Sequence, residues 1–235
     1  MRKIGFCHGA TFKILDPYSE TNISLFKKCG CNAIEVNCHS VSEADRFESI
    51  EESIRGFEYK SIHLPCDIKY RNDEATNNLL IKIVQYYKTI GAQLAVMHPD
   101  LIEDVSVFAK YPGANWAIEN MDDRKAKFKN VEDLREFFET NKQWNFVLDV
   151  GHCNANDKTM KLADDFIAEL KHKIKEIHLS GYEVFHDPLH RTEQVEIIKR
   201  CKLLDAPIII ESTFEKTDGV DGISKEFTYI LENLA

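Results

Sequence analysis

The sequence predicts an α/β fold, a single (β/α)₈ TIM barrel of nearly minimal length that spans residues 1–235. Short apolar runs alternate with amphipathic runs along the whole chain. The apolar runs are rich in Ile, Val, Leu and Phe, and most contain few polar residues, as is typical of parallel strands buried on both faces. Eight such pairs of segments give about 29 residues per unit, which is tight for a barrel of roughly 250 residues.

Eight strands are expected from the apolar runs, at residues 3–7, 33–37, 61–64, 94–97, 116–119, 145–149, 176–179 and 208–211. Between and after them, apolar residues recur every three to four positions, which predicts helices. These patterns lie at residues 23–30, 42–57, 79–91, 105–111, 131–138, 162–174, 197–201 and 227–234. Asn130 is a good helix N-cap, and Gly91 stands where a helix would end.

A doubly wound open sheet is the alternative architecture. Its dinucleotide-binding form needs a glycine-rich loop after the first strand. Gly5 and Gly9 lack the third glycine and the spacing of that loop.

The composition limits the compartment and the partners. Thirty Lys and Arg against 39 Asp and Glu give a net charge of −9, which argues against a general nucleic-acid coat protein. No apolar run approaches the roughly 18 residues that span a membrane, and no secretory signal is recognisable at the start. Seven cysteines without a disulfide pattern favour a reduced, cytoplasmic protein. The composition does not indicate the oligomeric state.

Histidines and acids gather at the predicted strand ends. Eight of the nine histidines lie at or just beyond such an end, and only His172 falls in a helical pattern. Glu119, Asp149 and Glu211 each end an apolar strand. In a barrel all these ends open on the face that carries the active site. A carboxylate there is costly to bury unless it is paired or binds a cation, and mixed oxygen and nitrogen ligands suit Zn²⁺ or Mn²⁺.

Each of these residues also has a plain structural interpretation when it is taken alone. A single acid at a strand end is often a helix cap, and a single histidine often donates to a loop carbonyl. The same placement recurs on six or more strands, and this recurrence favours a metal site.

The order of the short motifs resembles the xylose isomerase-like TIM-barrel superfamily, which includes endonuclease IV and many sugar isomerases and epimerases. The matching segments are SIHLP at 61–65, VMHP at 96–99, AIEN at 117–120, LDVGH at 148–152, IHLS at 177–180 and IE at 210–211. Together they cover the chain from the third strand to the eighth.

The resemblance implies a set of metal ligands, with one divalent ion held by Glu119, Asp149, His178 and Glu211. Similarity to endonuclease IV implies up to two further zinc ions. His63 and His98 would bind the second and share Glu119. The third would use His152 and an Asp-x-His pair that is absent here, for which His186, or Asp187 with His190, could substitute. One to three Zn or Mn ions are therefore expected.

Two enzymatic functions follow from this resemblance. The first is a sugar or sugar-phosphate isomerase or epimerase, in which Glu119 and Glu211 transfer a proton next to a metal-bound carbonyl and His152 holds the substrate. Lys69, Arg71, Arg124 or Lys125 would bind a substrate phosphate. The second is a zinc phosphoester hydrolase like endonuclease IV, which cuts DNA at abasic sites. Short length and the missing Asp-x-His pair favour the first. A non-catalytic metal-binding barrel is a third possibility.

Overall fold

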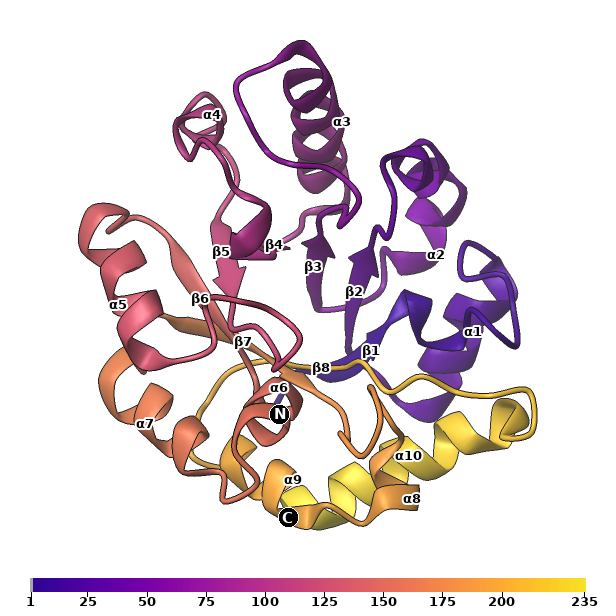
Figure 1. The fold of residues 1–235 in the computed structure, drawn as a ribbon. Coiled ribbons are helices and arrows are strands. Elements are labelled where there is room, and N and C mark those ends of the chain that lie inside the picture. The colour runs from indigo at the N-terminus through magenta and orange to yellow at the C-terminus, as the bar shows by residue number, and fades with distance from the viewer. Residues whose placement is uncertain (1) are drawn as a thin grey trace.

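The structure, a computed structural model, describes residues 2–235 and forms a closed barrel of eight parallel strands. Each strand pairs with the next in the sequence, and β1 pairs with β8 to close the ring. Figure 1 shows the helices arranged around this ring. The predicted (β/α)₈ fold is confirmed.

The strands are β1 (Ile4–Cys7), β2 (Ala33–Asn37), β3 (Tyr59–His63), β4 (Leu94–Met97), β5 (Trp116–Glu119), β6 (Asn145–Asp149), β7 (Ile174–Leu179) and β8 (Ile208–Ile210). The α-helices are α1 (Glu20–Cys29), α2 (Glu51–Ile54), α3 (Glu74–Ile90), α4 (Ser106–Ala109), α5 (Val131–Thr140), α6 (Val150–Asn156), α7 (Lys161–Leu170), α8 (Leu189–Thr192), α9 (Val195–Cys201) and α10 (Gly219–Leu234). Three 3₁₀ segments are η1 (His8–Thr11), η2 (Val41–Ile50) and η3 (Pro99–Leu101). Within residues 2–235 no helix is long and apolar enough to cross a membrane.

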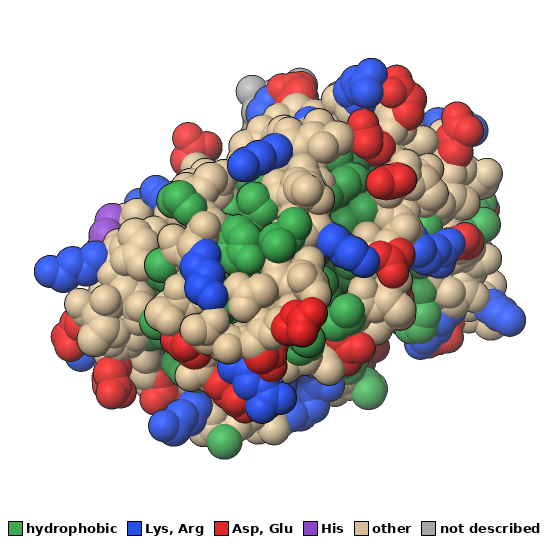
Figure 2. Space-filling model, turned by 90° about the horizontal axis from the view of Figure 1, so that it is seen from above, with side chains coloured by type: hydrophobic (Ala, Val, Ile, Leu, Met, Phe, Trp, Pro, Cys, Tyr) green, Lys and Arg blue, Asp and Glu red, His purple; other side chains and the backbone are tan. Residues whose placement is uncertain are grey.

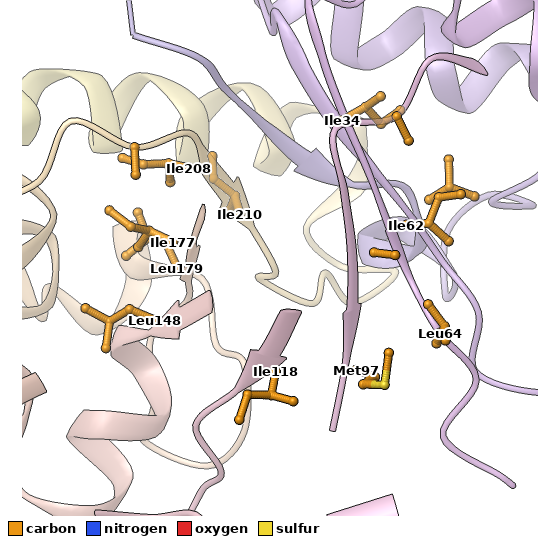
Figure 3. Packing of buried hydrophobic residues seen from close by; sticks show 14 of the residues in the cluster. Ile34, Ile62, Leu64, Met97, Ile118, Leu148, Ile177, Leu179, Ile208 and Ile210 are labelled. Carbon is orange, nitrogen blue, oxygen red and sulfur yellow. The ribbon is translucent and has the colours of Figure 1, made fainter. Parts of the chain in front are cut away.

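The largest hydrophobic core lies between the strands and the surrounding helices. Because neighbouring strand residues point to opposite faces, every second side chain of each strand faces outward. Figure 3 labels ten of these residues, which are Ile34, Ile62, Leu64, Met97, Ile118, Leu148, Ile177, Leu179, Ile208 and Ile210. They pack with helix residues such as Phe26 and Phe166, and their intervening neighbours point into the barrel.

The inside of the barrel is much more polar than its outside. Two small apolar clusters occupy part of the interior, one around Ala33 and Ile209 and the other around Val96 and Val147. Other inward positions carry polar or charged groups, of which Glu35, Ser61, Glu176 and His178 are fully buried. The strand-end groups therefore lie above a charged interior.

Several sequence predictions need correction. The helix expected at 42–57 is mostly η2, because its buried residues Ala44, Phe47 and Ile50 recur every three positions, which suits the 3₁₀ repeat. β3 begins at Tyr59, two residues earlier than expected. The two added residues include Lys60, whose side chain is buried and whose ammonium group donates to the Phe57 carbonyl. Ile174, assigned above to a helix, is the first residue of β7.

The histidines at strand ends are also less confined to loops than expected. His8, His152 and His190 lie in η1, α6 and α8, although only His172 was expected to fall in a helical segment. His8 and His152 are in short helical turns that follow β1 and β6 directly. In both places the helical turn begins at the residue that follows the last residue of the strand.

Candidate metal centre

Glu119, the last residue of β5, lies at the centre of the histidine-rich face. Its side chain is 1% exposed. One oxygen, Oε2, lies 3.4 Å from His63 Nε2 and 3.6 Å from His98 Nε2. The other, Oε1, lies 3.3 Å from His178 Nδ1 and 3.4 Å from His152 Nδ1. The two oxygens of one carboxylate therefore face two different groups of histidines.

Two sets of potential ligand atoms meet at Glu119. The first set contains His63, His98 and Glu119, and the second contains Glu119, Asp149, His178 and Glu211. Within each set, the potential ligand atoms lie within 4.8 Å of one another. The second set is the group of four that the sequence predicts for one ion, and the first is the pair of histidines expected to share Glu119.

The separations suit a cation better than direct hydrogen bonds. Donor atoms about 2.0–2.1 Å from a tetrahedral ion lie about 3.3–3.4 Å from one another. The contacts of Glu119 with His63, His98 and His178 measure 3.3–3.6 Å, and His178 Nδ1 lies 3.5 Å from Glu211 Oε1. These distances are long for good hydrogen bonds. The residues therefore fit a divalent ion in each set.

Asp149 provides a second observation that fits a cation. Its Oδ1 accepts the backbone N–H of His152 at 2.7 Å, so Asp149 is also the N-cap of α6. Its Oδ2 is buried and has no hydrogen-bond partner among the described residues. A buried carboxylate oxygen without a partner is costly. Capping α6 thus occupies one oxygen of Asp149 and leaves the other free to bind a cation.

Backbone carbonyls orient two of the histidines. His63 Nδ1 lies 3.0 Å from the Leu64 carbonyl, and His152 Nδ1 lies 2.8 Å from the Asn120 carbonyl. Each of these nitrogens would carry the proton that a carbonyl accepts. The Nε2 lone pair of His63 is then directed at Glu119. His152 Nε2 instead lies 3.8 Å from Asp122 Oδ2, on the side away from the shared carboxylate.

The charges of the centre are strongly coupled. Burial acts to raise the pKa of Glu119, but His178 and His63 outweigh it and hold that pKa well below its usual range. Burial raises the pKa of Asp149 to about 7 and that of Glu211 to about 8, and the negative charge of Glu119 adds to both shifts. Burial and the charge of Glu119 thus oppose the ionisation of Asp149 and Glu211 when no cation is bound.

The expected third site is not assembled in the same way. Asp187 Oδ2 accepts the backbone N–H groups of residues 183–185 at 2.7–3.1 Å and so holds its own loop. His190 Nδ1 lies 2.7 Å from Glu226, on α10. His186 does reach the centre, since its ring lies 5.5 Å from that of His152 and its Nδ1 lies 3.8 Å from Glu211 Oε2.

The basic residues expected to bind phosphate are placed unequally. Arg124 lines a cavity beside Glu119 and its histidines, which we call the central cavity. It pairs with Asp122 and stacks on Phe185, with 3.9 Å between its guanidinium carbon and the ring centre. Lys125 lines the same cavity and pairs with Asp100. Lys69 donates to the Asp100 carbonyl and Arg71 pairs with Asp73. Neither Lys69 nor Arg71 lines this cavity.

Two cavities open beside the centre. The central cavity has a volume of 240 Å³, and its lining includes His63, His98, Glu119, His152 and Arg124. The other, of 560 Å³, lies between the loops after β1 and β7, where Phe12 and Phe185 are partly exposed. Glu211 and His186 line both cavities, so a substrate in the larger one would reach the centre through them.

Sequence reasoning missed three residues at this site, which are two acids inside the barrel and one cysteine. Glu35 and Glu176 lie inside the barrel, next to His178, and both are fully buried. An acid inside an apolar strand was the available signal, as in AIEVN at 33–37 and IKEIH at 174–178. Cys66 was the other omission. Burial acts to raise its pKa, but the neighbouring His98 and His63 outweigh it and lower this pKa to about 5.

No protein-family model matches the chain, and no curated protein matches it. Solved structures do. Endonuclease IV from Thermus thermophilus is 15% identical with a TM-score of 0.70, and the alignment covers 98% of this chain and 99% of that one. D-allulose 3-epimerase from Methylomonas sp. is 14% identical with a TM-score of 0.69, covering 100% and 98%. A sugar phosphate isomerase/epimerase from Parabacteroides distasonis is 13% identical with a TM-score of 0.62, covering 100% and 96%.

All three of these proteins are enzymes by name, and they represent both reactions that the sequence suggests. At 13–15% identity the likeness establishes the fold and leaves the reaction open. The chain has the fold of the xylose isomerase-like TIM-barrel proteins.

Proposed function

We propose that the protein is a metal-dependent phosphoester hydrolase that holds two divalent ions, most simply zinc, on either side of Glu119. The observation that carries this proposal is the position of Glu119, whose two oxygens face two separate sets of ligand atoms. Proton transfer with one ion in the four-residue set would not use His63 and His98 as metal ligands. When bound, a pair of ions supplies Lewis acidity and stabilises both the attacking and the leaving oxygen of a phosphoester.

The chain's own residues have distinct roles in this proposal. His63 and His98 would hold one ion, while Asp149, His178 and Glu211 would hold the other, and Glu119 would bind both. Arg124 and Lys125 line the central cavity and would attract the negatively charged substrate. His152 and His186 would bind substrate oxygens, because their rings lie 5.5 Å apart and His186 lies beside Glu211.

Surface charge, the basic residues after β3 and chain length are the features that bear on which phosphoester is the substrate. Figure 2 shows one flank of the barrel, where acidic and basic side chains are interspersed around a group of hydrophobic side chains. Lys69 and Arg71, the basic residues after β3, do not line the central cavity. The length of the chain does not separate the candidates, since the alignments span 96–99% of neighbours from both classes.

A sugar or sugar-phosphate epimerase is the second candidate, and the larger cavity supports it. That cavity has a volume of 560 Å³ and reaches the ligand set through Glu211, which is a size and position suited to a sugar. In this function Glu119 and Glu211 would exchange the substrate proton, and one ion in the four-residue set would suffice.

Replacing His98 by Ala separates the two candidates. We expect the purified protein, loaded with Zn²⁺ or Mn²⁺, to cleave bis(p-nitrophenyl) phosphate or a duplex with an abasic-site analogue. His98→Ala should lower that rate by about 10²-fold or more, because the loss of one bound ion removes several kcal/mol of transition-state stabilisation. His172→Ala is the control, since His172 is exposed in the turn after α7 and not within a helix as its sequence pattern predicts.

The epimerase would give the opposite pattern. Deuterium from solvent would enter a ketose or ketose phosphate, and His98→Ala would leave the exchange rate nearly unchanged. Such exchange, with no cleavage of any phosphoester by the wild type, would contradict the hydrolase proposal.

A further inference from the structure

Two carboxylates that neither ligand set uses lie deeper in the barrel, below the proposed metal centre. Glu35 lies in the middle of β2, and Glu176 lies two residues before His178 on β7, so Glu176 and His178 point to the same side of their strand. Both acids are 0% exposed. The β6–β7 pairing shifts its register between Phe146 and Val147, and beyond this shift Val147 pairs with Glu176 and Asp149 with His178.

Both acids contact the same nitrogen of His178. Its Nε2 lies 3.1 Å from Glu176 Oε1 and 3.2 Å from Glu35 Oε2. The other nitrogen, Nδ1, faces Glu119 and Glu211 at 3.3 and 3.5 Å. A neutral imidazole carries one N–H and one lone pair. With two carboxylates at Nε2, the N–H lies on that side and the Nδ1 lone pair points to the ligand set.

The arrangement is costly unless a cation lies above it. Glu35 Oε1 and Glu176 Oε2 are buried and have no hydrogen-bond partner among the described residues, and Ser61 Oγ donates to Glu35 Oε2 only at 3.5 Å. Five carboxylates therefore share the interior and its upper rim, namely Glu35, Glu119, Asp149, Glu176 and Glu211. Two divalent ions would bring four positive charges to this region, and these would offset most of the repulsion.

We propose that Glu35 and Glu176 are positioning residues that fix His178 with Nδ1 toward the metal and thereby set the affinity of the centre for divalent cations. The inference rests on the proposed function, because it needs an ion in the four-residue set. A carboxylate that accepts the second N–H of a metal-bound histidine orients the ring and makes it a stronger ligand. The pair Glu35 and Glu176 would do this from inside the barrel, where water does not compete.

The test is the binding of Co²⁺ to metal-free protein, followed by competition with a chromophoric chelator and by the visible absorption of the bound ion. Glu176→Gln and Glu35→Gln should each weaken binding in the four-residue set by about 10–100-fold and alter the Co²⁺ spectrum. Glu226→Gln is the matched control. Glu226 is equally buried and accepts hydrogen bonds from Ser212 and His190, away from the centre. It should change the thermal stability and leave Co²⁺ affinity unaltered.

A double-mutant cycle shows whether the effect passes through His178. In a His178→Ala background, Glu176→Gln should cause little further loss of affinity. The inference would be overturned if both Gln variants bound Co²⁺ with wild-type affinity and spectrum while their metal-free thermal stability stayed close to that of the wild type. The inference would also be overturned if Glu176→Gln weakened Co²⁺ binding as much in the His178→Ala background as it does in the wild type. If the wild-type protein binds no Co²⁺, the proposed metal centre itself fails, and the outcomes are thus distinguishable.

Discussion

Glu119→Gln is expected to reduce phosphoester cleavage by about 10³-fold or more and to remove both metal ions from the protein. Glutamine keeps the shape of the side chain, but its amide cannot bring negative charge to two sites at once. The oxygen that faces His63 and His98 and the oxygen that faces His178 belong to the same carboxylate. Several kcal/mol of transition-state stabilisation depend on the ions, and each 1.36 kcal/mol corresponds to a factor of ten.

The measurement combines the cleavage rate with metal analysis of the same preparation. Asp133→Asn is a suitable control, because Asp133 accepts the Phe128 backbone N–H near the start of α5 and touches neither ligand set. That variant should keep its ions and its rate. A Glu119→Gln protein that retains two ions and cleaves at the wild-type rate would refute the role given to Glu119.

Removal of the ions is expected to lower the thermal midpoint of unfolding by about 10 °C or more. An ion present at a thousand times its dissociation constant stabilises the folded state by about 4 kcal/mol. For a chain of this size, 1 kcal/mol shifts the midpoint by about 2–4 °C. Repulsion among the five carboxylates of the barrel interior and its upper rim adds to the loss when no cation is present.

Differential scanning calorimetry before and after chelation, and again after Zn²⁺ is restored, provides this measurement. The midpoint should rise with the logarithm of free Zn²⁺. In Glu119→Gln the chelator should have little effect, because there are no ions to remove. A wild-type midpoint that is the same with chelator and with excess Zn²⁺ would contradict the proposed metal centre.

The barrel could be predicted because its signal is local and repeated. Apolar runs such as FVLD at 146–149 recur at regular intervals, and three of them end in a carboxylate that would be unfavourable inside an apolar core. Asp149 and Glu119 could be located for the same reason. Exact boundaries were less predictable. Lys60 lies within β3 because its ammonium group reaches the Phe57 carbonyl, and no local pattern indicates that contact.

The inner carboxylates and the loop after β7 show where sequence reasoning stops. Glu35 and Glu176 meet only when the barrel closes and brings β2 and β7 to one histidine. Asp187 and His190 resemble a metal-binding pair in sequence. Asp187 instead accepts three backbone N–H groups of its own loop, and His190 contacts Glu226 from a distant helix. Such partners depend on the tertiary structure, so the sequence does not distinguish a ligand from a loop cap.

The central claim is that the barrel binds two divalent ions that share Glu119. The most direct test is the metal content per chain, measured by inductively coupled plasma mass spectrometry on protein purified without added metal and again after equilibration with Zn²⁺. We expect two ions per chain in the wild type, one in His98→Ala and none in Glu119→Gln. A wild-type protein that binds no ion after equilibration, or one that binds a single ion which His98→Ala leaves in place, would contradict the account.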